Sequence, residues 1–129
     1  MTVVGLEHVL VLSDDIEASR EFYTEVVGLV VGDRPPLEFP GYWLYAGGVP
    51  CVHIADRCAY LEHAARLGLR ESAGPVDHVA FNGTDYDALC SRVERCEVPA
   101  VRNFVPNGGP RQLFIEDPSG VRIEINVRR

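Results

Sequence analysis

Short apolar runs along the chain, separated by turns rich in glycine and proline, predict strands and helices in a fixed order. A helix is predicted after the capping residues Ser13, Asp14 and Asp15, because apolar residues then recur at three-to-four spacing up to Gly28. A second helix is predicted over residues 85–96. Strands are predicted at residues 3–12, 29–32, 42–46, 50–55, 76–81, 100–105, 111–116 and 121–127. The order β-α-β-β-β therefore occurs twice.

The two halves also resemble each other residue by residue. At an offset of 70, residues 6–9 match residues 76–79, with an apolar residue, an acid, a histidine and a valine in both. Residues 42–45 match residues 112–115 at the same offset, and residues 52–54 match residues 123–125 at an offset of 71. Several matches in order indicate a duplicated unit.

The duplication predicts an α+β fold in one domain. We expect a first βαβββ module at residues 1–55, a linker at residues 56–75 and a second module at residues 76–129. The linker contains a short helical stretch around residues 60–67 and a turn at residues 72–75. Because one module cannot bury both its helix face and its sheet, the two modules are expected to pair into a cupped mixed sheet with the helices outside.

Composition narrows the class of protein. A net charge of −7 and an isoelectric point near 5.0 argue against binding to nucleic acid, whose partners carry basic patches. No apolar run approaches the roughly 20 residues that cross a bilayer, and the N-terminus shows no signal peptide. The four cysteines have no CxxC spacing, so reduced thiols and a cytoplasmic location are expected.

Four candidate metal ligands follow the same repeat. His8 and His78 are 70 residues apart, and His53 and Glu124 are 71 apart. Strand alternation places His53 and Glu124 on the face opposite their isoleucine and valine neighbours, which favours an open, concave face. Three imidazoles and a carboxylate suit Fe²⁺, Mn²⁺, Ni²⁺, Co²⁺ or Zn²⁺, and a subset of two His and one carboxylate suits non-haem iron. The alternative is a set of half-buried, hydrogen-bonded histidines and a solvated Glu.

Several stretches resemble the vicinal oxygen chelate superfamily, which includes glyoxalase I, bleomycin-resistance proteins and extradiol dioxygenases. Residues 116–125 (EDPSGVRIEI) resemble its closing signature, residues 6–9 its opening strand and residues 77–81 its mid-chain strand. Phe22-Tyr23 and the following Val27-Gly28-Leu29 resemble the end of its first helix. The resemblance covers essentially the whole chain.

The resemblance implies roles for individual residues. His8, His78 and Glu124 match the first, third and fourth metal-ligand positions, and His53 falls at the second, which is a Glu in glyoxalase I. In isomerase-type relatives, a carboxylate at the position of Glu124 can also act as the base that removes a proton. The metal acts there as a Lewis acid on a substrate chelated through neighbouring oxygens. A small-molecule substrate and a homodimer are also implied, with the modules paired within one chain or swapped between two.

Three functions stay open at this point. The favoured one is a metal-dependent lyase or isomerase acting on a small oxygen-chelating metabolite. An extradiol-type ring-cleaving dioxygenase is the first alternative, although Phe114 stands where those enzymes have a Tyr, and His63 is the only further histidine. A binding protein of the bleomycin-resistance type is the second alternative, although such proteins usually lack the ligands. The candidates for the pocket wall are Tyr42, Trp43, Phe104, Asn107, Arg111 and Gln112.

Overall fold

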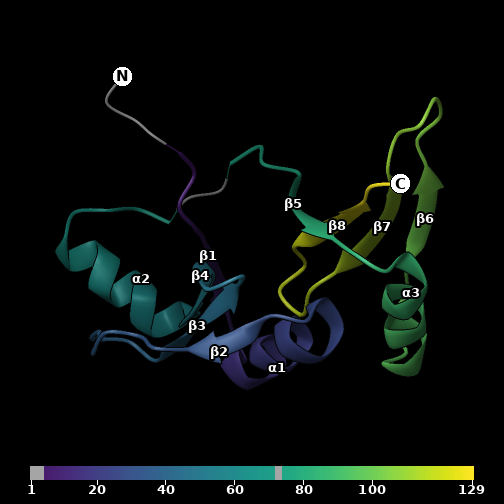
Figure 1. Cartoon of the computed structure of the whole chain (residues 1–129). Helices are drawn as coiled ribbons and strands as arrows, with labels where there is room; N and C mark the ends of the chain where they lie inside the picture. Colours follow the sequence, from purple (N-terminus) through teal and green to yellow (C-terminus); the bar gives the residue numbers. More distant parts are fainter. Residues whose placement is uncertain (1–4, 72–73) are drawn as a thin grey trace. The chain divides into compact units, whose positions relative to one another are not determined.

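The computed structural model describes residues 5–71 and 74–129, which form two compact units divided at Gly74. Each unit contains a four-stranded mixed sheet, and together the described residues form three α-helices and one π-helix (Figure 1). The α+β class and the βαβββ order of each half are therefore confirmed. The two units are described separately below.

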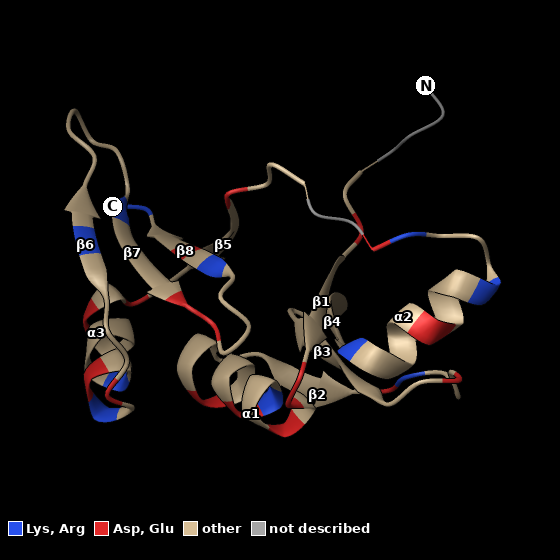
Figure 2. Ribbon diagram, turned by 180° about the vertical axis from the view of Figure 1, so that it is seen from behind, with Lys and Arg blue, Asp and Glu red and all other residues tan. Residues whose placement is uncertain are grey.

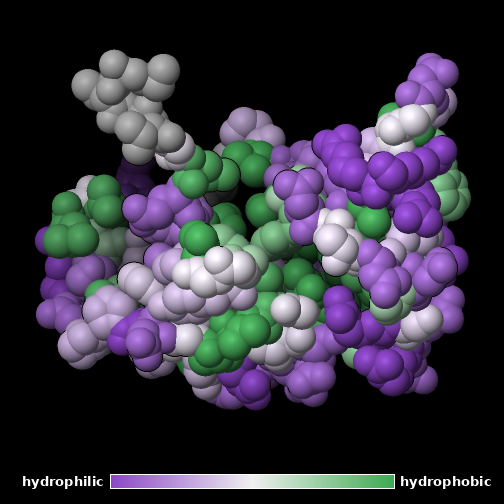
Figure 3. Space-filling model, in the orientation of Figure 1, coloured by the Kyte–Doolittle hydropathy of each residue, from purple (hydrophilic) through white to green (hydrophobic). Residues whose placement is uncertain are grey.

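The first unit contains β1 (Val9–Ser13), β2 (Val30–Gly32), β3 (Gly41–Ala46) and β4 (Val49–Asp56) in the order β1-β4-β3-β2. β1 runs parallel to β4, and the other neighbours are antiparallel. One face of the sheet carries Leu44, Val52 and Ile54, all almost fully buried, and α1 (Ile16–Glu21) packs against β3 and β4. Apolar side chains also gather on the surface over β2, where Val30 and Val31 are exposed (Figure 3).

The first helix has the ends that its sequence predicts, with an unpredicted change between them. The side chain of Asp15 caps α1 by accepting a hydrogen bond of 3.0 Å from the Ala18 amide. The helix then continues as a π-helix (η1, Phe22–Val27). It ends at Gly28, whose φ of 91° lies in the left-handed region that glycine adopts without strain.

The second unit repeats this arrangement. It contains β5 (His78–Gly83), β6 (Val101–Phe104), β7 (Arg111–Glu116) and β8 (Arg122–Val127) in the order β5-β8-β7-β6, with β5 parallel to β8. Its helix α3 (Tyr86–Arg95) buries one apolar side, and acidic and basic residues alternate on the other (Figure 2). The buried residues of the sheet are Leu113, Ile115, Ile123, Ile125 and Val127.

The strand registers confirm the duplication and correct one detail of it. Leu10 pairs with His53 in the first sheet, and Ala80 pairs with Glu124 in the second, so His53 and Glu124 occupy equivalent positions. Trp43 pairs with His53 as Phe114 pairs with Glu124. The match of residues 42–45 to residues 112–115 was therefore wrong by one residue, because the offset is already 71 in β3 and β7.

Most predicted elements are confirmed, and two differ. Of the strand predicted at residues 3–12, residues 5–8 lie outside any strand, β1 begins at Val9, and residues 3–4 lie outside the described residues. The segment predicted as a linker contains a ten-residue helix, α2 (Arg57–Arg66), which is capped by Asp56. Of the turn predicted at residues 72–75, Ser72 and Ala73 lie outside the described residues. Within the described ranges, none of the helices has the length and apolar character needed to span a bilayer.

Candidate metal centre

An acidic residue immediately precedes a histidine in both modules and binds it in the same way. The Nδ1 atom of His8 lies 2.9 Å from Oε1 of Glu7, and the Nδ1 atom of His78 lies 2.9 Å from Oδ2 of Asp77. Because an ionised carboxylate only accepts, Nδ1 carries a hydrogen in each pair, and in the neutral imidazole Nε2 is the nitrogen that keeps its lone pair. Metal-binding histidines are held by this kind of carboxylate partner in many proteins.

In the second module, the lone pair of His78 faces a carboxylate. Nε2 of His78 lies 3.7 Å from Oε1 of Glu124, and the Glu124 side chain is only 13% exposed. Both atoms are acceptors when the imidazole is neutral, so a cation between them would relieve their repulsion. Two ligands at about 2.1 Å from one ion lie about 3.0–3.6 Å apart, depending on the angle between them. The observed spacing is close to this range, so the pair fits a metal ion.

The Asp77 carboxylate is itself paired with the side chain of Arg122. Its Oδ2 atom also accepts a hydrogen bond of 2.8 Å from Nη1 of Arg122. The hydrogen bond from His78 and the positive charge of Arg122 hold the pKa of Asp77 below its usual range. Asp77 therefore stays ionised at neutral pH and keeps the ring of His78 oriented.

In the first module, His53 lies in a stack of three rings. Its ring centroid is 3.8 Å from that of His8, with 13° between the planes, and 4.1 Å from the six- and five-membered ring system of Trp43, with 9° between the planes. His53 is only 9% exposed, and its Nε2 donates a hydrogen bond of 3.0 Å to the carbonyl of Pro50. Burial, followed by the nearby His8, lowers the pKa of His53, so His53 is neutral at pH 7.

As long as the ring stack is present, it limits the metal binding of His53. An imidazole nitrogen binds a metal ion close to the plane of its ring, and two planes 3.8 Å apart and only 13° from parallel do not meet near the rings. His8 and His53 therefore cannot bind one ion in this arrangement. His53 would have to leave the stack to become a fourth ligand, and its predicted ligation stays a prediction.

Within each module the candidate donors come in twos: His8 with His53, and His78 with Glu124. Among residues 5–71 and 74–129, no group of three or more His, Cys, Asp or Glu side chains is placed to hold an ion. None of the four cysteines forms a disulfide. The predicted four-residue set would have to draw donors from both modules, so its convergence stays a prediction.

The predicted pocket-wall residues lie on different faces of the sheets. Trp43 is on the same face as His53, whereas Tyr42 is on the opposite face, where its hydroxyl donates to Glu17 of α1. Phe104 and Arg111 face α3, and the guanidinium of Arg111 lies 4.8 Å from the centre of the Tyr86 ring.

Because strand neighbours alternate, Phe104 and Arg111 lie on the face opposite Glu124, which does not favour a shared site with it. Asn107 is exposed in the turn between β6 and β7, with a φ of 59°. The substrate contacts expected of these residues stay predictions.

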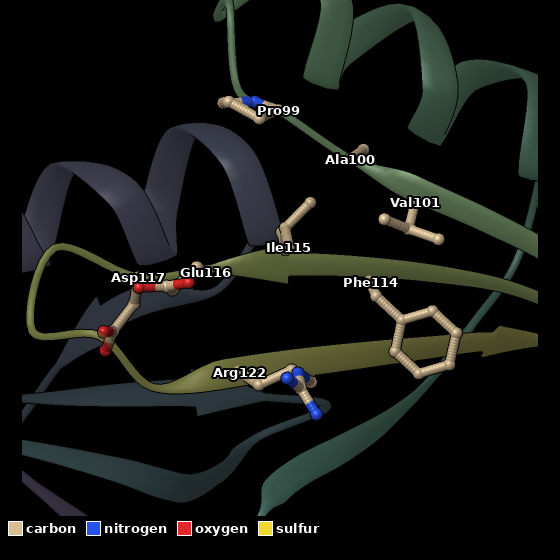
Figure 4. Close-up of a pocket in the computed structure, with 8 residues that line it drawn as sticks. All are labelled: Pro99, Ala100, Val101, Phe114, Ile115, Glu116, Asp117 and Arg122. Atoms are coloured by element: carbon tan, nitrogen blue, oxygen red, sulfur yellow. The ribbon is translucent and has the colours of Figure 1, made fainter.

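A pocket of about 540 Å³ borders the strand of Glu124. Phe114, the register partner of Glu124, and Arg122 point to the same side of β7 and β8, whereas Ile115 points the other way (Figure 4). The eight lining residues are Pro99, Ala100, Val101, Phe114, Ile115, Glu116, Asp117 and Arg122. The pocket therefore offers apolar and charged contacts beside the Glu124 face.

Sequence reasoning gave no role to the residues that hold the candidate ligands. Glu7 and Asp77 stood in the matched runs, and their position directly before each histidine was the available signal. Asn126 also received no role, although its Nδ2 donates a hydrogen bond of 2.8 Å to Oε2 of Glu124. The signal there was a polar residue two positions along an alternating strand.

The fold and these pairs define an α+β protein of duplicated βαβββ modules, each with a carboxylate-bound histidine at the start of its sheet. A sequence profile of the Glyoxalase/Bleomycin resistance protein/Dioxygenase superfamily matches residues 5–125. The chain belongs to this superfamily.

Individual relatives agree with this assignment. The protein named Glyoxylase I 4 from Arabidopsis thaliana is 32% identical over 127 residues, covering 95% of this chain and 70% of that protein. The structure of lactoylglutathione lyase from Agrobacterium tumefaciens has a TM-score of 0.71 at 22% identity, covering 98% and 96% of the two chains. That of TnmS3, an antibiotic binding protein from Streptomyces sp. CB03234, has a TM-score of 0.70 at 21% identity, covering 100% and 99%. The two solved structures show the fold.

Proposed function

We propose that this protein is a metal-dependent lyase or isomerase that acts on a small, oxygen-chelating metabolite. The observation that carries the proposal is the pair formed by His78 and Glu124. The lone pair of His78 Nε2 faces Glu124 Oε1 at 3.7 Å, while Asp77 holds the other nitrogen of the ring. The 32% identity to a protein named Glyoxylase I 4 supports the same class of reaction.

The proposed ligands are His8, His78 and Glu124, with His53 as a fourth only if it leaves its stack with Trp43. This set suits Fe²⁺, Mn²⁺, Ni²⁺, Co²⁺ or Zn²⁺. When bound, the metal ion would act as a Lewis acid that stabilises negative charge on a chelated substrate oxygen.

The proposed work of the chain itself centres on the carboxylate of Glu124. Its Oε2 atom accepts a hydrogen bond from Asn126, and Oε1, the proposed metal-binding oxygen, keeps a second lone pair that would accept a proton from a substrate carbon next to a carbonyl group. Phe114 lies directly across the sheet from Glu124 and lines the pocket of about 540 Å³, so its ring would exclude water from one side of the reacting atoms. Arg122 lines the same pocket and would meet an anionic group of the substrate.

One observation favours an extradiol-type dioxygenase as a second candidate. While His53 stays stacked on His8 and Trp43, the remaining donors are two histidines and one carboxylate, the set found in non-haem iron oxygenases. Two residues oppose this reading. Phe114 lacks the hydroxyl of the expected Tyr. The Nδ1 atom of His63, on α2, lies 3.1 Å from Oε2 of Glu38.

The decisive experiment adds Fe²⁺, Mn²⁺, Ni²⁺, Co²⁺ or Zn²⁺ singly to metal-free protein and measures binding and turnover. The substrates are a hemithioacetal of a dicarbonyl, an epimerisable thioester and a catechol, one for each reaction class. We expect binding of one ion and turnover of the hemithioacetal or the thioester. Catechol cleavage would instead support the dioxygenase, and ligand binding without turnover on any substrate would support a binding protein.

Two matched variants make this test specific. Glu124→Gln is expected to abolish turnover and weaken metal binding, because it removes a charged ligand and the proposed base together. Glu62→Gln makes the same change at an exposed position on α2, outside the pocket lining, and is expected to leave both unchanged. Equal losses in the two variants would contradict the role of Glu124. We also propose a cytoplasmic homodimer: the lack of disulfides among the four cysteines supports the location, and the family resemblance supports the dimer.

A further inference from the structure

A continuous line of hydrogen-bonded side chains crosses the second sheet and ends on Glu124. Nδ2 of Asn103 on β6 donates to Oε1 of Gln112 on β7 at 2.8 Å. Nε2 of Gln112 donates to Oδ1 of Asn126 on β8 at 3.1 Å, and Nδ2 of Asn126 donates to Oε2 of Glu124 at 2.8 Å. We call these four residues the amide ladder. The register pairs Asn103 with Gln112 and Gln112 with Asn126, so the ladder follows one row of the sheet.

All the hydrogen bonds of the ladder point in one direction. Asn103 donates through its nitrogen, Gln112 and Asn126 each accept through the oxygen and donate through the nitrogen, and the last acceptor is a carboxylate. Turning the Gln112 amide over would set its nitrogen against that of Asn103 and its oxygen against that of Asn126, which would cost both hydrogen bonds. The orientation of Gln112 therefore fixes that of Asn126, and Asn126 in turn offers Glu124 a donor.

The ladder leaves the two oxygens of Glu124 in different states. Oε2 is taken by Asn126, whereas Oε1 faces the lone pair of His78 at 3.7 Å. A hydrogen bond to a charged acceptor is stronger than one between neutral groups, so it resists rotation of the carboxylate. Oε1, which lies nearer His78 and accepts no hydrogen bond from the ladder, is therefore the oxygen placed to bind an ion.

We propose that Asn126 and Gln112 are positioning residues that, through the amide ladder, hold the Glu124 carboxylate so that Oε1 faces His78. This inference rests on the proposed function, because it assigns a use to that oxygen. Partners of this kind typically change metal affinity by about 10–100-fold when they are removed.

The variant Gln112→Glu separates the ladder from plain electrostatics. The new side chain has nearly the same shape and can still accept from Asn103, but it cannot donate to Asn126. A second carboxylate near the site should strengthen binding of a divalent cation if charge alone matters. The ladder predicts the opposite, because the Asn126 amide loses its fixed orientation.

Asn82→Asp is the matched control. Asn82 is the register neighbour of Asn126 on β5, it is exposed, and it stands outside the ladder. The substitution makes the same chemical change on the same face and so measures the effect of added charge. Gln112→Met, which removes both hydrogen bonds without adding charge, serves as a second ladder variant.

The first measurement is Mn²⁺ binding to metal-free protein, followed by electron paramagnetic resonance. We expect Gln112→Glu and Gln112→Met to weaken binding by about tenfold, and Asn82→Asp to leave it equal or stronger. Binding by Gln112→Glu that is as tight as that of Asn82→Asp would overturn the proposal.

The second measurement needs no metal and separates this inference from the proposed function. In NMR spectra of the metal-free protein, the Asn126 side-chain amide should show the slow hydrogen exchange of a bonded group in the wild type and in Asn82→Asp. That protection should be lost in both Gln112 variants. Unprotected Asn126 in the wild type would overturn the ladder, whereas a protected amide in a protein that binds no Mn²⁺ would count against the proposed function alone.

Discussion

The indole of Trp43 lies face to face with the imidazole of His53, with 4.1 Å between ring centroids and 9° between planes. Trp43 is the only tryptophan in the chain, so tryptophan fluorescence comes from the residue that stacks on His53. His53 is also 9% exposed and stacked on His8 on its other side. The environment of a single histidine can therefore be followed through one optical signal.

The lowered pKa of His53 makes stability depend on pH. In the unfolded chain a histidine titrates near pH 6.5. In the folded state burial keeps the pKa lower, so below about pH 6.5 the unfolded state takes up the proton first and stability falls with falling pH. In urea unfolding of metal-free protein followed by CD, wild-type protein should lose more stability between about pH 7 and pH 5 than His53→Phe, which stacks without titrating. An equal loss of stability in the wild type and in His53→Phe would show that His53 is not the cause.

The bond between Asp77 and His78 predicts a separable effect on metal binding. Asp77→Ala should weaken Mn²⁺ binding by about 10–100-fold, because the ring of His78 loses the partner that orients it. Arg122→Gln removes only the other partner of Asp77 and should have a much smaller effect. Isothermal titration calorimetry with Mn²⁺ compares the loss of affinity in the two variants. If the losses were equal, the charge of Arg122 rather than the orientation of His78 would control the site.

Metal binding should stabilise the protein at neutral pH and much less in acid. An ion that binds only the folded state at 100 times its Kd adds about 2.7 kcal/mol. In a domain of this size, that amount raises Tm by roughly 8–15 °C. At about pH 5 protonated imidazoles compete with the ion, so the gain should be small. Differential scanning calorimetry with and without each of the five metals measures this gain in Tm. An unchanged Tm at about pH 7.5 with all of them would argue against the metal site.

The two equivalent helix caps should respond differently to the same substitution. Asp15 and Asp85 both accept a hydrogen bond from the amide three residues on, but φ is −140° at Asp15 and 53° at Asp85. Asp15→Ala should cost about 1 kcal/mol of unfolding free energy for the lost cap. Asp85→Ala should cost about 1 kcal/mol more, because alanine is strained at positive φ.

Glycine at each position provides the control for this prediction. Asp15→Gly should cost only a few tenths of a kcal/mol, because glycine is a good N-cap residue, and Asp85→Gly should cost about as little, because glycine adopts a positive φ without strain. Urea unfolding followed by circular dichroism gives the four values. Equal costs for the two alanine variants would show that the backbone at Asp85 relaxes.

The sequence predicted the architecture well because apolar periodicity and capping residues are local signals. Asp15, Asp85 and Gly28 mark helix ends that the structure confirms. The helix α2 was predicted only as a short stretch within a linker, since it is weakly amphipathic and buries little beyond Ala64. The π-helix depends on a change of backbone hydrogen bonding that no side-chain pattern in this chain signals.

For the candidate site, the sequence showed which residues repeat but not how they are held. The equivalence of His53 and Glu124 was predicted and is confirmed by the registers. The stacking of His53 on Trp43 could not be predicted, because it depends on how side chains pack across the neighbouring strands β3 and β4. The direction of the amide ladder likewise depends on the rotation of each side-chain amide, which strand alternation does not fix.

The π-helical segment Phe22–Val27 gives the first module a place where its chain length can change. A π-helical turn closes its hydrogen bond over one residue more than an α-helical turn, so it holds an additional residue without shifting the elements on either side. Removing Thr24, whose hydroxyl donates back to the Arg20 carbonyl at 2.9 Å, would allow this segment to return to α-helix. A single-residue deletion should therefore be tolerated in the middle of this helix, whereas within β4 it would turn His53 onto the opposite face of the sheet.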